Sequence, residues 1–182
     1  MMPVLPRIPW KTGSGKKTLR LSLHKPGFMK VSVTESFLVT GISIRTSNAP
    51  GKAENDIPAL WTRFWSEGIL NQLADRVNDA IYSVYTNYQS DHTGEYDVIL
   101  GCRANAASGS SAGMLRSVRI EAGPFEQFTA EGDLMQGIVF NEWVKVWNAR
   151  LDRAFTADFE VYDERATDSA NAVVDLFIAV RS

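Results

Sequence analysis

One order of predicted elements occurs twice along this chain: a strand or a pair of strands, then a helix, then two further strands. The first copy covers about residues 29–104 and the second about 114–182, with a small, uncharged connector at 105–113 between them. Each copy would expose one face of its sheet if it folded alone, so the two copies should pack together. Such a pair leaves a cleft along its pseudo-two-fold axis, which is where ligand sites tend to lie.

Hydrophobic periodicity supports this order of elements. Apolar residues spaced by three and four predict a helix from Ile57 to about Val77, with Pro58 in its first turn and a break at Gly68. The same spacing predicts a second helix over residues 138–151. Alternation predicts strands over residues 31–44 with an interruption, 81–88, 96–103, 116–122, 125–130, 155–162 and 172–181.

The first 28 residues differ from the rest of the chain. They hold six basic residues and no acidic one, together with several prolines and a Gly-Ser-Gly stretch. We interpret residues 1–28 as a flexible leader, with Met29 as a second candidate start. The alternative is a basic arm that contacts nucleic acid or an acidic partner.

Composition narrows the classes of protein that remain. The formal net charge of −2 argues against a nucleic-acid-binding surface on the folded part. A lone cysteine, Cys102, excludes an internal disulfide framework and fits a reducing compartment. No apolar run approaches the roughly 20 residues that a membrane span requires. We therefore expect a cytoplasmic protein with no membrane contact.

Six blocks of sequence resemble the GyrI-like effector-binding family, the ligand-sensing module of several multidrug-responsive transcription regulators. The resemblance is strongest to the stand-alone, integron-cassette-associated branch, and it runs from about Met29 to the C-terminus. The order and spacing of the blocks carry it, and they are residues 57–64, 81–88, 94–101, 143–147, 158–163 and 175–180.

The resemblance implies a fold and a function. It implies a duplicated α+β fold in which two antiparallel sheets meet at a ligand cleft and the helices pack behind them. It also implies a protein that binds cationic, apolar, drug-like effectors, as a sensor in transcription regulation or drug response. The regulators carry a DNA-binding helix-turn-helix ahead of this module. The leader is too short and too interrupted by proline to be one, so we expect none in this chain.

The resemblance also implies roles for particular residues. A glutamate in the position of Glu160 lies at the pocket floor and meets the positive charge of the ligand. The position of Asp175 often holds a second acid, usually glutamate, and that of Phe177 often holds tyrosine. These two departures shorten the second acid by one methylene and remove a phenol from the expected site.

Strand alternation leads to a similar site from the residues themselves. It places Asp158, Glu160 and Tyr162 on one face of their strand. In the partner strand Asp175 and Phe177 share a face, while the opposite face is wholly aliphatic and should form the core. We therefore predict that the two mixed acidic and aromatic faces lie together across the final hairpin.

The acidic position differs between the two copies, because Thr86 is predicted to match Glu160. An acid that occurs in only one of two similar copies is not needed for the fold, so it suggests a ligand-binding site. Alternation favours Tyr88 over Tyr85 as the tyrosine that reaches the cleft. Three tryptophans at helical spacing are candidates for its walls, although each is by default a core residue: Trp61, Trp143 and Trp147.

A glutamate among aromatic rings suits a cationic ligand. A desolvated carboxylate is costly when it is alone, and its pKa rises. A bound cation removes that cost, and ring faces add cation–π attraction of roughly 0.5–2 kcal/mol each. The alternative for Glu160 is a solvated strand residue, or one paired with an arginine such as Arg153.

Enzymatic and metal chemistry have thinner support. His92 lies near Asp91 and Glu95 in a turn, where such residues are common without a metal, so we predict neither a metal nor a cofactor. The alternative function uses the same pocket, with Glu160 as general base in a hydrolase of small electrophilic compounds. Expected partners are a cationic small molecule and a regulator protein. Either a monomer or a homodimer fits the sequence.

Overall fold

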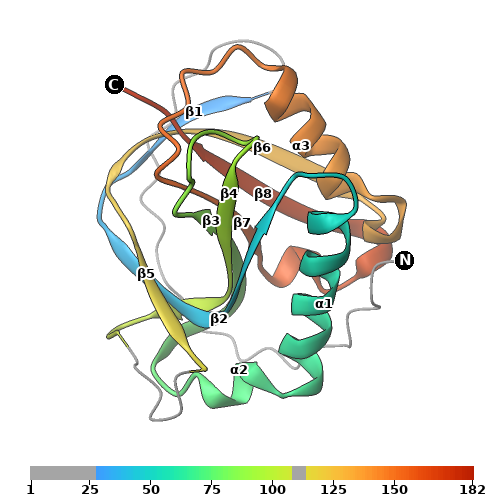
Figure 1. The fold of residues 1–182 in the computed structure, drawn as a ribbon. Helices are drawn as coiled ribbons and strands as arrows, with labels where there is room; N and C mark the ends of the chain where they lie inside the picture. The colour runs from blue at the N-terminus through green and yellow to red at the C-terminus, as the bar shows by residue number, and fades with distance from the viewer. Residues whose placement is uncertain (1–27, 108–113) are drawn as a thin grey trace.

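The two copies of the repeat share one continuous antiparallel sheet in the computed structural model, which describes residues 28–107 and 114–182 (Figure 1). The predicted leader, apart from Phe28, and connector residues 108–113 lie outside the described residues. Within those residues the sheet has eight strands: β1 (Met29–Val33), β2 (Phe37–Ser47), β3 (Arg76–Thr86), β4 (Glu95–Ala104), β5 (Arg116–Ile120), β6 (Gly123–Gly132), β7 (Ala157–Tyr162) and β8 (Ala172–Ala179).

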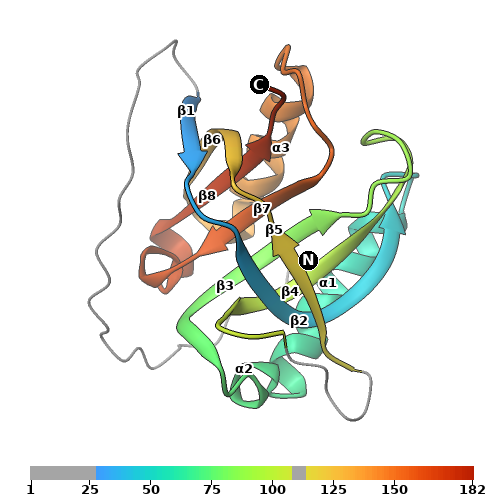
Figure 2. The same ribbon diagram turned by 90° about the vertical axis from the view of Figure 1, so that its left-hand side faces the viewer.

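The order of the strands has a two-fold relation centred between β7 and β3. Across the sheet the order is β1-β6-β8-β7-β3-β4-β2-β5, so each strand of one half has a counterpart at the same distance from the centre. The two predicted sheets are therefore the halves of one curled sheet, joined edge to edge by the pairing of β3 with β7 (Figure 2). The duplicated α+β fold is confirmed.

The first strand of each copy is exchanged between the halves. Strand β1 pairs with β6, which belongs to the second copy, and β5 pairs with β2, which belongs to the first. Neither half is complete without a strand from the other copy, so the two copies form one folding unit.

The helices are α1 (Lys52–Ser66), α2 (Ile69–Gln72) and α3 (Ile138–Asn148). Helix α1 begins earlier than predicted, so Pro58 lies in its interior, and left-handed Gly68 (φ 61°) separates it from α2. Val77, which was predicted to end the helix, lies in β3, because the apolar periodicity runs on through this break. Among the described residues, no helix has the length and apolarity to cross a membrane.

The two faces of the sheet bury different clusters. One face, here named the helical face, carries Leu100, Phe128 and Leu176 and packs against residues of α1 and α3, including Phe64 and Val146. The opposite face buries a second cluster that includes Val84, Ile99 and Phe159, with Phe177 packed against it. Both long helices therefore lie on one side of the sheet, and they can wall a site only on that side.

Candidate ligand-binding site

Glu160 lies in β7 at the junction of the two halves, directly across from Ser83 of β3. Its side chain is on the helical face and is only 2% exposed. Three neutral donors hold the carboxylate. The hydroxyl of Tyr85 and the indole Nε1 of Trp143 donate to Oε1 at 2.8 and 2.6 Å, and the hydroxyl of Tyr162 donates to Oε2 at 2.8 Å. The donors come from β3, α3 and β7, so both copies build the site.

No ion pair reaches Glu160 within the part of the chain that the structure describes. Burial raises the pKa of its carboxyl, and the three hydrogen bonds oppose that rise because they favour the charged form. Burial, and then the charge of Glu160, raise the pKa values of Tyr85 and Tyr162 well above the usual range. Both phenols therefore stay protonated and act as donors at physiological pH.

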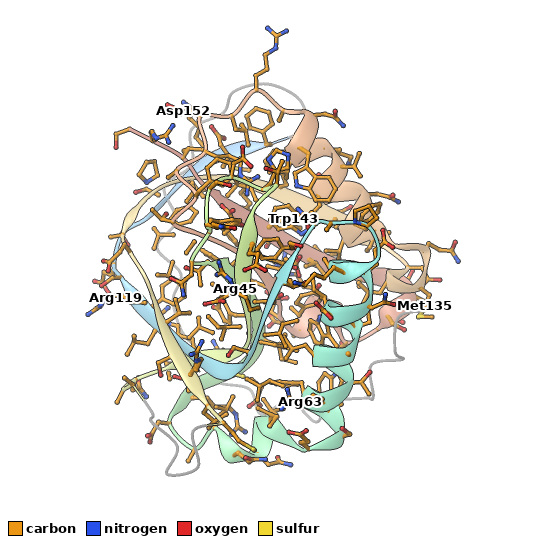
Figure 3. All side chains as sticks on the ribbon, viewed as in Figure 1. Arg45, Arg63, Arg119, Met135, Trp143 and Asp152 are labelled. Carbon is orange, nitrogen blue, oxygen red and sulfur yellow. The ribbon has the colours of Figure 1, made fainter. Side chains whose placement is uncertain are left out.

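Aromatic rings surround this carboxylate. Trp61 of α1 meets the ring of Tyr162 edge-on, with centroids 4.9 Å apart, and stacks on Trp65 at 6.4 Å. From the other helix, Trp143 meets Tyr85 edge-on at 5.0 Å. Figure 3 shows Trp143 between α3 and the sheet. One tryptophan from each copy thus stands near the central acid, so of the predicted wall residues Trp61 and Trp143 do come together with Glu160 and Tyr162.

The side chains that contact the carboxylate of Glu160 carry no charge. The described residues contain no cluster of three or more His, Cys, Asp or Glu side chains that could hold a metal ion. Glu160 is a buried carboxylate whose three hydrogen-bond donors are all neutral.

A family model decides which proteins this chain is related to. The model of the integron-associated effector binding proteins, Cass2, matches residues 31–180. The chain belongs to this family. The match covers both copies of the repeat, including every residue that contacts Glu160.

Individual relatives agree with that assignment. An integron cassette protein of Vibrio cholerae, VCH_CASS2, is 32% identical and superposes with a TM-score of 0.65 over 91% of this chain and all of its own. YobU of Bacillus subtilis (strain 168), whose name marks it as a proposed transcriptional regulator, is 29% identical over 85% of this chain and 99% of its own length. SAV2435, solved with tetraphenylphosphonium bound, shares the fold at 17% identity, with a TM-score of 0.63 over 85% of this chain and 94% of its own.

In this effector-binding fold Tyr85 contacts Glu160, where alternation had favoured Tyr88. Asn87 between them adopts a left-handed conformation (φ 49°), which breaks the alternation just after β3 ends. Both tyrosines then lie on the same side, each next to Tyr96, with ring centroids 6.0 and 5.6 Å from it. Tyr88 donates its hydroxyl to Asp158 at 2.7 Å and not to Glu160. An asparagine directly after a strand was the sequence signal for this break, because asparagine adopts the left-handed conformation more readily than most residues.

The predicted placement of Asp175 and Phe177 beside Glu160 is wrong. Glu160 pairs with Leu176, and Phe159 pairs with Phe177, so the face of β8 that was taken for core is the face that Glu160 shares. Asp175 lies on the opposite face, where Arg165 pairs with it at 2.7 Å and Thr129 donates to it at 2.8 Å. The register across the hairpin, which alternation does not define, decides this.

Thr86 is not the counterpart of Glu160 either. It pairs with Ala157 and lies on the face opposite to Glu160, and its hydroxyl donates to the carbonyl of Thr156 at 2.9 Å. Ser83, which pairs with Glu160 across the junction of the two halves, is uncharged.

Trp147 stands apart from the central acid. It is 37% exposed, and its ring packs against Phe140 at 5.9 Å and lies 6.3 Å from Trp143. Trp143 and Trp147 are four residues apart in α3, yet one ring is buried and the other is exposed. Trp147 therefore lies at the exposed C-terminal end of α3.

Proposed function

We propose that this protein binds lipophilic cations with aromatic or other apolar substituents, and that Glu160 neutralises the positive charge of the ligand. The observation that carries the proposal is a glutamate 2% exposed, with three neutral donors and no cationic partner among the described residues. Burial makes an ionised group in such a place costly, and a bound positive charge would offset that cost.

The donors fit a cation that has no N–H groups of its own. Trp143 and Tyr85 occupy Oε1 and Tyr162 occupies Oε2, so few acceptor positions remain for a ligand. A quaternary or otherwise delocalised cation needs no acceptor, because it interacts through its charge and through ring faces. The tetraphenylphosphonium that SAV2435 binds is a cation of this kind, which supports the proposal.

Ligand entry requires movement of aromatic side chains. Trp61 and Trp143 are 8% and 9% exposed, and their rings pack against Tyr162 and Tyr85, two of the donors to Glu160. A bound aromatic cation would take the place of part of this packing, so binding should change the tryptophan fluorescence. The rings also supply contact area that tolerates different ligand shapes.

The biological role that fits is effector sensing in transcription regulation or drug response. The family is described as effector binding, and the name of YobU points to transcription. In this proposal the loaded protein acts in the cytoplasm through a separate regulator partner. General-base catalysis by Glu160 on an electrophilic ligand is the competing function. The raised pKa of Glu160 favours it, and the three donors on the carboxylate weaken it.

The test is a comparison of tetraphenylphosphonium with neutral triphenylphosphine oxide by tryptophan fluorescence and calorimetry. We expect Glu160→Gln to lower the affinity for tetraphenylphosphonium by more than about tenfold, roughly 1.4 kcal/mol. The affinity for triphenylphosphine oxide should stay unchanged. Glu121→Gln is the control, because it removes the same charge from a side chain that is 73% exposed.

If the native protein and Glu160→Gln each bind the cation and the neutral compound with equal affinity, the cation site is refuted. Hydrolysis of an aryl ester or epoxide by the native protein, lost in Glu160→Gln, would instead establish the competing enzymatic function.

A further inference from the structure

A second buried acid lies on the same strand face as Glu160. Asp158 is 0% exposed and sits two residues earlier in β7. Side chains at i and i+2 of a strand point to the same face, with their Cα atoms roughly 7 Å apart. The helical face of β7 therefore carries two carboxylates where a single cation needs one.

Arg153 neutralises the second acid. Its Nη2 lies 2.5 Å from Oδ2 of Asp158, and both side chains are buried. Asp158 also accepts from the hydroxyl of Tyr88 at 2.7 Å and from the backbone N–H of Ala179 at 2.8 Å. The guanidinium lies over the ring of Phe155, 4.4 Å from its centroid.

Two other buried acids are also paired with cations of the protein. Glu142 of α3 is 3% exposed and accepts from Lys145 at 2.6 Å. Asp175 on the other face pairs with Arg165. Both carboxylates have a cation of the protein beside them, whereas Glu160 has neutral donors alone. Glu126 of β6, also buried at 4% exposed, differs again, because Lys30 partly offsets the rise in its pKa that burial causes.

We infer that Arg153 is a specificity-determining residue that limits the site to ligands with one positive charge. The inference rests on the proposed function and adds the number of charges that the ligand carries. Glu160, Asp158 and Arg153 together have one net negative charge on a desolvated face. A monocation completes the neutralisation, whereas a dication brings a second charge that has no counterpart and must lose its hydration.

Two ligands of nearly the same shape separate one charge from two. They are 1-methyl-4-phenylpyridinium, with one charge, and methyl viologen, in which a second methylated ring nitrogen adds another. We expect the native protein to bind the monocation more than about tenfold tighter by calorimetry. Arg153→Met frees the charge of Asp158, so the ratio of affinities should move toward the dication by at least tenfold.

A second variant covers the case in which Arg153→Met does not fold, since a broken buried ion pair is strongly destabilising. Asp158→Asn keeps the shape and leaves the guanidinium unpaired near Glu160. This variant should lower the affinity for both ligands, and more so for the dication. The ratio of affinities should therefore move toward the monocation. The double variant Arg153→Met/Asp158→Asn should return the ratio to the native one.

Opposite movements of the ratio support the inference, because lost packing alone would shift both ligands alike. If the monocation binds and the ratio stays unchanged in every variant that folds, the inference is wrong and the proposed function stands. If 1-methyl-4-phenylpyridinium does not bind the native protein at all, while tetraphenylphosphonium also fails, the proposed function falls and the inference with it.

Discussion

Two opposing influences act on Glu160, and their balance defines the chemistry of the site. Burial favours the neutral acid, while the hydrogen bonds from Trp143, Tyr85 and Tyr162 favour the carboxylate. Burial is the larger influence, so the pKa of Glu160 lies above its usual value of 4.5. A carboxyl held in this way is ready to ionise when a cation arrives, and cation binding should release a proton when the pH is near that pKa.

The raised pKa predicts how stability depends on pH. Below pH 4.5 Glu160 is protonated in the folded and the unfolded protein. Between that value and the folded pKa, only the folded protein keeps the proton, so rising pH favours unfolding. The stabilisation from this group is therefore complete at low pH and is lost as pH rises through the folded pKa.

Glu160→Gln removes this contribution. We expect the melting temperature of the native protein, relative to the variant, to fall as pH rises from 4.5 through the folded pKa. Thermal melts of both proteins across this pH interval show whether the difference in melting temperature changes in this direction. A native protein that gains stability over the variant with rising pH would contradict a raised pKa.

At the scale of elements, strands β2 and β4 approach each other unusually closely. Gly41 and Gly101 lie directly opposite each other in the register. A Cβ atom on Gly101 would lie 2.0 Å from the backbone oxygen of Thr40, and one on Gly41 would lie 2.0 Å from that of Leu100. The neighbours are backbone atoms, so neither can rotate away, and glycine is required at both positions.

Gly101→Ala should therefore lower the free energy of unfolding by at least about 2 kcal/mol, because the strands must separate to admit the methyl group. Urea denaturation measures the loss. Gly123→Ala is the matched control: Gly123 is also a strand glycine, but a Cβ atom there meets nothing within 4 Å. Equal stability of the two variants would show that the close approach is absent in solution.

At the scale of the whole molecule, the exchanged strands and the β3–β7 pairing tie the halves together. Strand β1 completes the second half and β5 the first, and Glu160 accepts hydrogen bonds from side chains of both. A half that unfolded alone would leave a sheet edge and the buried acid exposed. The site therefore exists only when both copies are folded.

This coupling predicts one cooperative unfolding transition. Four of the five tryptophans lie in α1 and α3, so tryptophan fluorescence reports mainly on these helices. Fluorescence and far-ultraviolet circular dichroism, which reports on all elements, should give the same urea midpoint. Two separated transitions would mean that the halves fold independently, against the strand exchange.

Local patterns in the sequence determined a large part of this description. The repeated order of strands and helices follows from hydrophobic periodicity, which is a property of each segment alone. The shared face of Asp158, Glu160 and Tyr162 follows from the two-residue period of one strand, and the hydrogen bond from Tyr162 to Glu160 is consistent with it. Glu160 as the central acid follows from the resemblance and from the neighbouring aromatic residues.

Tertiary structure alone decided what meets Glu160 from other segments. Alternation says which residues of a strand share a face, but it does not say which face of the next strand lies beside them, so Asp175 and Phe177 were placed on the wrong side. One left-handed residue, Asn87, brought Tyr85 and Tyr88 to the same side. The exchange of β1 and β5, and the pairing of Arg153 with Asp158, depend on contacts between distant segments, which no local period encodes.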